Sequence, residues 1–133
     1  MTYLNRAISD LKAAEICLEP AYNPSNDEGV LDICGYHIQQ AVEKTLKYIL
    51  HDMNGVDDTT RRFRTHDIVS LIVMVESETA VVIPDAIKQI AVLLTQWEVT
   101  TRYPSGISTV RSELVETIAI AKPFVLSYYA KTE

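Results

Sequence analysis

The sequence contains few of the residues that mark several common protein classes. It has only two cysteines, four glycines and five prolines in 133 residues. Two cysteines are too few for a disulfide framework and match no zinc-ligand spacing. We therefore expect Cys17 and Cys34 to be buried, reduced thiols in a cytoplasmic protein. The scarcity of glycine and proline argues against a turn-rich all-β protein.

Long apolar runs and an excess of positive charge are also missing. No apolar stretch approaches the roughly 20 residues of a membrane span, and we expect no membrane association. The formal net charge is -6, so any binding of nucleic acid must depend on a local basic patch. Phosphate-binding glycine loops and metal-ligand clusters are absent too, and we expect neither a cofactor nor a metal ion.

What the sequence does contain is helical periodicity over nearly its whole length. Hydrophobic residues make up 47% of the chain and recur at spacings of three and four. Five helices are expected, covering residues 2–18, residues 27–53, and segments that begin at Thr65, at Pro84 and after Gly106. The pattern predicts one all-α domain over residues 1–133, an antiparallel four- to five-helix bundle whose second and fifth helices are long.

The second helix has one apolar face and one polar row. The apolar face, at about 100° per residue, consists of Leu31, Cys34, Ile38, Ala41, Val42, Thr45 and Ile49. His37, Gln40, Lys44 and Lys47 follow one another at spacings of three, four and three. This row can line a polar cleft or a dimer interface, or it can be a solvated face with pairs within the helix.

A basic segment precedes the third helix. Arg61, Arg62 and Arg64 cluster in an otherwise acidic chain, and arginine forks suit phosphate. Phe63 can stack on a base. The alternative is a solvent-exposed loop.

The start of the third helix carries Thr65, His66 and Asp67. We expect Thr65 to cap the helix, with Asp67 in its first turn. Arg61 and His66 are separated by four residues, as in the Arg-x4-6-His signature of one class of metal-independent RNases. In that chemistry the histidine handles the proton of the ribose 2′-hydroxyl and the arginine steadies the phosphate. Alternatively, His66 bonds only to local backbone.

A third signal lies before the last helix, at Arg102 and Tyr103. A guanidinium and a phenol at this position can hold a phosphate and a base. Equally, Tyr103 and Pro104 can pack at the start of the last helix while Arg102 pairs with Glu98.

Together these three signals resemble the HEPN domain family of higher eukaryotes and prokaryotes. The resemblance is carried by Tyr-His-Ile-Gln-Gln-Ala-Val-Glu-Lys-Thr-Leu-Lys at residues 36–47, Thr-His-Asp-Ile at residues 65–68 and Arg-Tyr-Pro at residues 102–104. It covers essentially the whole chain. It implies a compact helical bundle, usually a homodimer, with a role in nucleotide or RNA handling. Relatives are often encoded beside a minimal nucleotidyltransferase, and some such pairs act as toxin and antitoxin.

The resemblance also assigns residues, with one departure. It matches Gln39, Gln40, Glu43 and Lys44 to the motif of the second helix, His66 to the histidine that opens the third, and Arg102 and Tyr103 to the motif before the last. RNase members of the wider superfamily carry Arg-x4-6-His near their final helix. No histidine follows Arg102 in residues 103–109, and this favours a non-catalytic branch.

We therefore predict a non-catalytic module that dimerises and binds nucleotide or RNA, as a partner of a nucleotidyltransferase. The expected ligand contacts are His37, Gln40, Lys44, Lys47, His66, Arg102 and Tyr103. One alternative is a metal-independent RNase toxin that uses Arg61 and His66, or Arg102 across a dimer interface. A second is a protein-interaction adaptor that binds through the polar row of the second helix.

Overall fold

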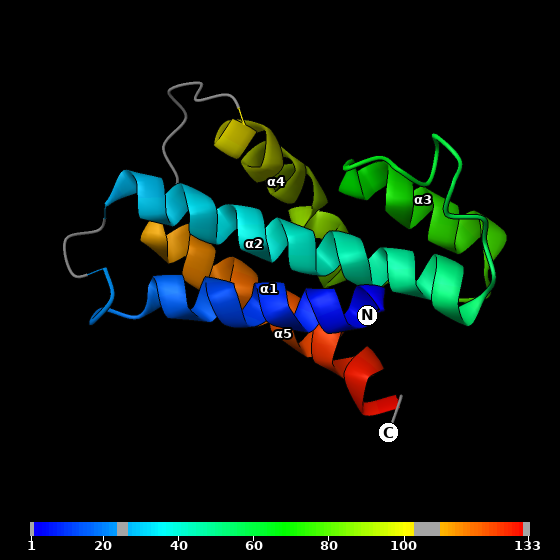
Figure 1. Cartoon of the computed structure of the whole chain (residues 1–133), viewed down its shortest axis with the longest axis horizontal. Coiled ribbons are helices and arrows are strands. Elements are labelled where there is room, and N and C mark those ends of the chain that lie inside the picture. The colour runs from blue at the N-terminus through cyan, green and yellow to red at the C-terminus, as the bar shows by residue number, and fades with distance from the viewer. Residues whose placement is uncertain (1, 24–26, 103–109, 132–133) are drawn as a thin grey trace.

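In the computed structural model, residues 2–23, 27–102 and 110–131 are described, and they form helices and the connections between them (Figure 1). In chain order the elements are α1 (Tyr3–Leu18), α2 (Glu28–Lys47), the π-helix η1 (Tyr48–Met53), α3 (Ile68–Glu78), α4 (Asp85–Arg102) and α5 (Arg111–Lys131). No strand occurs in these residues. The all-α fold with long second and fifth helices is confirmed, and α2 continues into η1 without a break.

The first two helices begin at side chains that bond to their free backbone N–H groups. Thr2 caps α1 by accepting a hydrogen bond from the Asn5 N–H at 3.1 Å. Asp27 caps α2 by accepting from the Val30 N–H at 3.1 Å. α1 and α2 therefore each begin one residue later than expected, because Thr2 and Asp27 act as caps.

The cap of α3 differs from the prediction, because Asp67 rather than Thr65 fills it. The Asp67 carboxylate accepts from the N–H groups of Val69 and Ser70 at 3.0 and 3.3 Å. The Thr65 hydroxyl instead accepts from the Asp67 N–H at 3.1 Å. A charged carboxylate is the stronger acceptor at a helix N-terminus. Thr65 therefore shapes the turn that leads to the cap.

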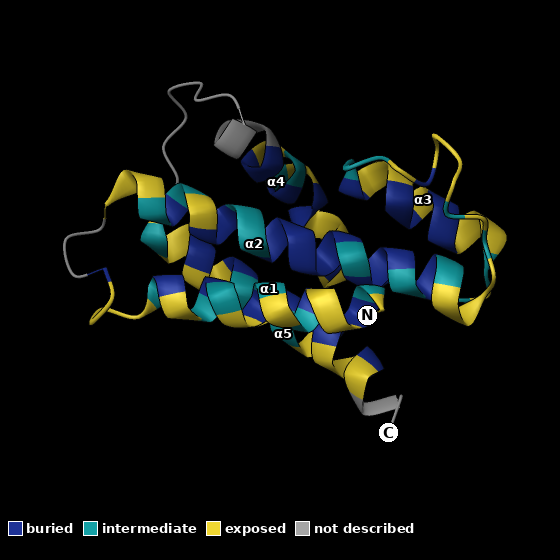
Figure 2. Ribbon diagram, in the orientation of Figure 1, coloured by how far each residue is buried: buried dark blue, intermediate teal, exposed yellow. Residues whose placement is uncertain are grey.

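The second helix lies at the centre of the bundle. All seven residues of its predicted apolar face are buried. Burial also extends around the helix, since every residue from 38 to 43 is buried (Figure 2). The reason is that α2 contacts α1, α3, α4 and α5. Gln40 and Lys47 are consequently buried, and the expectation of a solvated polar row is wrong for these two residues.

The contact between α2 and α4 depends on a glycine. A Cβ atom at Gly35 would lie 2.9 Å from Cδ2 of the buried Trp97 indole. The absence of a side chain at Gly35 thus lets the indole pack directly on the α2 backbone.

The two cysteines lie in the core near the contact of α1 and α2. Both thiols are free and buried, in agreement with the prediction. The Cys34 thiol donates to the Ala14 carbonyl oxygen at 3.3 Å, and burial raises its pKa to about 12. Cys34 is therefore a protonated packing residue.

Candidate functional site

The fold divides the predicted polar row of α2 between two neighbours. On the α1 side, His37 Nδ1 lies 2.9 Å from Asp10 Oδ1 and Lys44 Nζ lies 2.6 Å from Asp10 Oδ2. The Asp10 side chain is only 13% exposed. Its negative charge compensates the positive charge of the Lys44 ammonium. This half of the row is therefore engaged in a polar contact between α1 and α2.

The other half of the row belongs to a buried hydrogen-bond network that faces α3. Gln40 Nε2 donates to Gln39 Oε1 at 2.6 Å, and Gln39 Nε2 donates to Glu43 Oε1 at 3.0 Å. Lys47 Nζ pairs with Glu43 Oε2 at 3.2 Å. All four side chains belong to buried residues. Gln39, Gln40 and Glu43 of the Gln-Gln-Ala-x-Glu-Lys segment, together with Lys47 one turn after Glu43, therefore place two amides and an ion pair in the interior of the bundle.

His66 connects this network to the surface. Its Nδ1 lies 2.9 Å from Glu43 Oε1, and its carbonyl oxygen accepts from Gln39 Nε2 at 3.2 Å. Its side chain is 42% exposed, whereas that of Glu43 is 4% exposed. One edge of the imidazole is thus fixed by a buried carboxylate while the ring reaches the surface. With Nδ1–H donating to this carboxylate, Nε2 can accept a proton, and the imidazolium so formed can donate from Nε2 to an anionic oxygen.

The start of α3 also lies against α4. The Ile68 N–H donates to Thr95 Oγ1 at 3.2 Å, immediately after the histidine and the capping aspartate. Glu98 follows Thr95 by one turn and is buried. The backbone of α4 ends four residues later, at Arg102. The side chain of Arg102 and all of Tyr103 lie outside the described residues, as do the predicted pairing of Arg102 with Glu98 and the start of the last helix expected after Gly106.

The basic segment before α3 contributes exposed cations but no aromatic platform. Arg62 pairs with Glu78 at 2.7 Å. Arg61 and Arg64 are exposed and form no ion pair within the described part of the chain. Phe63 is only 1% exposed, with Lys47 Nζ 5.6 Å from its ring centre. The expectation that Phe63 stacks on a base is therefore wrong, because its ring fills the core.

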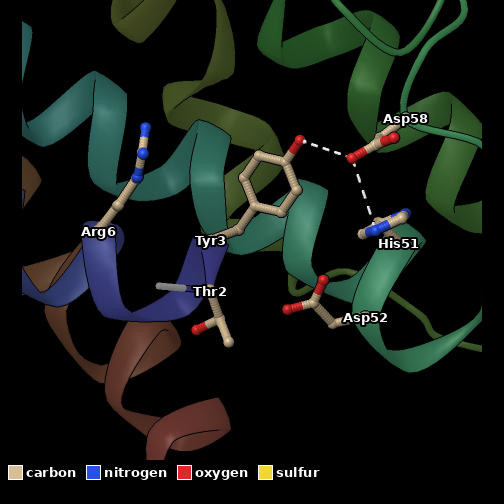
Figure 3. A pocket seen from close by; sticks show the side chains of 6 residues that line it. All are labelled: Thr2, Tyr3, Arg6, His51, Asp52 and Asp58. Carbon is tan, nitrogen blue, oxygen red and sulfur yellow. Dashed lines mark hydrogen bonds and ion pairs between the residues drawn. The ribbon is translucent and has the colours of Figure 1, made fainter.

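Sequence reasoning missed a polar pocket of about 430 Å³ where the N-terminus of α1 meets η1 (Figure 3). Asp58 Oδ2 accepts from the Tyr3 hydroxyl at 3.3 Å and lies 3.5 Å from His51 Nε2. These residues come from three separate segments, and no sequence spacing relates them. Glu43 and Asp10 were likewise absent from the predicted ligand contacts, although the resemblance had matched Glu43.

The pocket shifts the acid–base equilibria of two of its residues. Burial, followed by the nearby Asp58 carboxylate, raises the pKa of Tyr3. The hydrogen bond from His51 to the Val56 carbonyl oxygen, together with the charges of Asp58 and Asp52, raises the pKa of His51. The pocket therefore favours a neutral phenol and a protonated imidazole.

The sequence matches the HEPN domain family over residues 1–127, and the chain belongs to this family. No curated protein and no solved structure matches it. Among the described residues, no group of three His, Cys, Asp or Glu side chains is arranged to hold a metal ion. Within the same part of the chain, no helix is both long and apolar enough to cross a membrane.

Proposed function

We propose that this HEPN domain is a non-catalytic module that binds nucleotide or RNA where α3 begins and α4 ends. Residues 1–133 act as one domain in this proposal. Homodimerisation and pairing with a minimal nucleotidyltransferase, as in a toxin–antitoxin pair, belong to the same proposal and rest on the family resemblance.

The observation that carries the proposal is the buried network that orients His66. Burying Glu43 and Lys47 costs desolvation energy, which their pairing and hydrogen bonds offset. A bundle with only a packing role has no need of a charged pair at its centre. Here the Glu43 carboxylate fixes an imidazole at the surface, and preorganised donors bind an anion with less loss of entropy.

Local positive charge supports the same placement. Arg61 and Arg64 are exposed a few residues before His66, and Arg102 lies in the α4 turn after Glu98. Guanidinium groups bind phosphate through paired N–H donors. A phosphate near His66 is therefore expected to gain from Arg102 and from the basic segment, despite the net charge of -6.

The remaining predicted contacts would act from less accessible positions. A ligand that binds His37 or Lys44 must compete with Asp10 for them. Gln40 and Lys47 are buried, so they act on a ligand through Glu43 and His66. Tyr103 follows α4 directly and remains the predicted stacking residue.

The test is the affinity of the purified protein for a fluorescent single-stranded RNA, measured by anisotropy without added metal. We expect His66→Ala and Arg102→Ala each to weaken binding by about tenfold or more, as loss of a charge-assisted contact does. Lys88→Gln is the matched control, because it removes a positive charge that pairs with Glu76 elsewhere on the surface. Unchanged affinity in both site variants would contradict the proposal.

A second candidate function, a metal-independent RNase, is favoured by the contact between Glu43 and His66. A carboxylate that orients an imidazole is a common arrangement for a general base. RNA incubated with a chelator should stay intact with the wild type if the module is non-catalytic. Cleavage by the wild type that is lost in His66→Ala and Arg61→Ala would replace the binding proposal with the nuclease.

A further inference from the structure

The pocket beside the N-terminus of α1 is a second candidate ligand-binding site, separate from the surface at His66. It is lined by Thr2, Tyr3, Arg6, His51, Asp52 and Asp58 (Figure 3). Its volume of about 430 Å³ is within the range of small-molecule sites. Along the axis of α2 and η1, His51 is eight residues from Glu43, or about 12 Å.

Three of the lining side chains are held in place by other parts of the protein. Asp58 contacts both the Tyr3 hydroxyl and His51 Nε2, and His51 Nδ1 lies 2.9 Å from the Val56 carbonyl oxygen. The buried Phe63 packs against the Tyr3 and His51 rings, with centroid distances of 5.8 and 6.2 Å. The aromatic and acidic wall is therefore preorganised.

Two other side chains of the pocket, Arg6 and Asp52, are not fixed in this way. Arg6 and Asp52 are exposed, and neither forms an ion pair within the described part of the chain. Both side chains line the pocket and do not pair with each other. Each is therefore available to contact a ligand bound there. Arg6 lies in the first turns of α1, where the helix dipole adds to its attraction for an anion.

We propose that this pocket binds a guanine nucleotide. Guanine presents two adjacent N–H donors, N1–H and the exocyclic amino group, and a carboxylate accepts both at once. Asp52, which forms no hydrogen bond or ion pair within the described part of the chain, supplies that carboxylate, and the fixed Tyr3 ring supplies the surface on which the base stacks. Arg6 then binds the 5′-phosphate. This site goes beyond the ligand site at His66 and does not depend on it.

Calorimetric titration of the full chain with GMP, AMP, CMP, UMP and guanosine tests the proposal. We expect GMP to bind at least about tenfold more tightly than the other three nucleotides, because only guanine can make the bidentate contact with the carboxylate. Asp52→Asn should remove this preference. Arg6→Gln should weaken GMP but leave guanosine unchanged, because only the phosphate contact is lost.

Two variants keep this test separate from that of the proposed function. Arg62→Gln is the control for Arg6→Gln, because it removes an exposed arginine that pairs with Glu78. His66→Ala should bind GMP as the wild type does, and its loss of RNA affinity would concern the other site alone. Equal binding of all four nucleotides, or no binding of GMP, would overturn the guanine assignment.

Discussion

Glu43 is the residue on which most of the buried polar chemistry depends. Its carboxylate accepts from Gln39 and pairs with both Lys47 and His66. Removal of the Glu43 carboxylate would take a strong acceptor from each of these partners. Because the site is buried, water cannot easily replace that acceptor.

We expect Glu43→Leu to destabilise the protein by about 3–5 kcal/mol, because it leaves the Lys47 ammonium buried without its partner. The double variant Glu43→Leu/Lys47→Met should recover much of this loss, since no charge is then buried. The free energy of unfolding in urea measures both. A double variant as unstable as the single one would show that packing, and not the unpaired charge, sets the cost.

Gly35 is the residue on which the contact with Trp97 depends. A new Cβ would lie 2.9 Å from the indole, and overpacking of this kind costs about 1–3 kcal/mol. We expect Gly35→Ala to destabilise the fold although alanine favours helix. Gly29→Ala is the comparison, because the nearest atom there belongs to the Asp27 side chain at 3.2 Å. Thermal melts should rank Gly29→Ala well above Gly35→Ala, and the reverse order would contradict this packing.

At the scale of elements, the end of α2 and the start of α3 decide where the functional side chains lie. The π-helix η1 brings His51 to the Val56 carbonyl oxygen, and the Asp67 cap fixes the first turn of α3 just after His66. The contributions of the His51 contact and of the Asp67 cap to the free energy of unfolding can both be measured.

Asp67→Ala should destabilise the protein by about 0.5–2 kcal/mol, because α3 loses the acceptor of two backbone N–H groups. Thr65→Ala removes a single hydrogen bond outside the helix and should cost less. Urea unfolding of the two variants side by side gives the comparison. A larger loss at Thr65 would mean that threonine is the effective cap.

His51 should make stability depend on pH. Its hydrogen bond to Val56, aided by Asp58 and Asp52, raises its pKa in the folded state. The added stability is therefore complete below its unfolded pKa of roughly 6.5 and is lost as the pH rises through the folded pKa.

The melting temperatures of the wild type and His51→Gln, recorded from pH 5.5 to 9, test this dependence. The advantage of the wild type should be largest at the acid end and should shrink as the pH rises. An advantage that stays constant or grows toward pH 9 would show that His51 protonation adds no stability.

At the scale of the whole molecule, the helical pattern predicted the fold better than the site. Spacing alone identified the apolar face of α2, because the period of a helix decides which residues share a side. It did not reveal that α2 is central and buried on all sides over residues 38–43, since that follows from how four other helices pack. Asp10 is 27 residues from His37, and Glu43 is 23 residues from His66. Such partners meet only through the tertiary fold.

The most direct test of the account is a nuclear magnetic resonance titration of the ¹⁵N-labelled protein with single-stranded RNA in the absence of metal. If RNA binds where α3 begins and α4 ends, the largest shifts should fall on the amides of residues 65–68 and 95–102. In His66→Ala the same shifts should require about tenfold more RNA, in line with its weaker binding. Shifts confined to α5, or no shifts at saturating RNA, would contradict the proposed function.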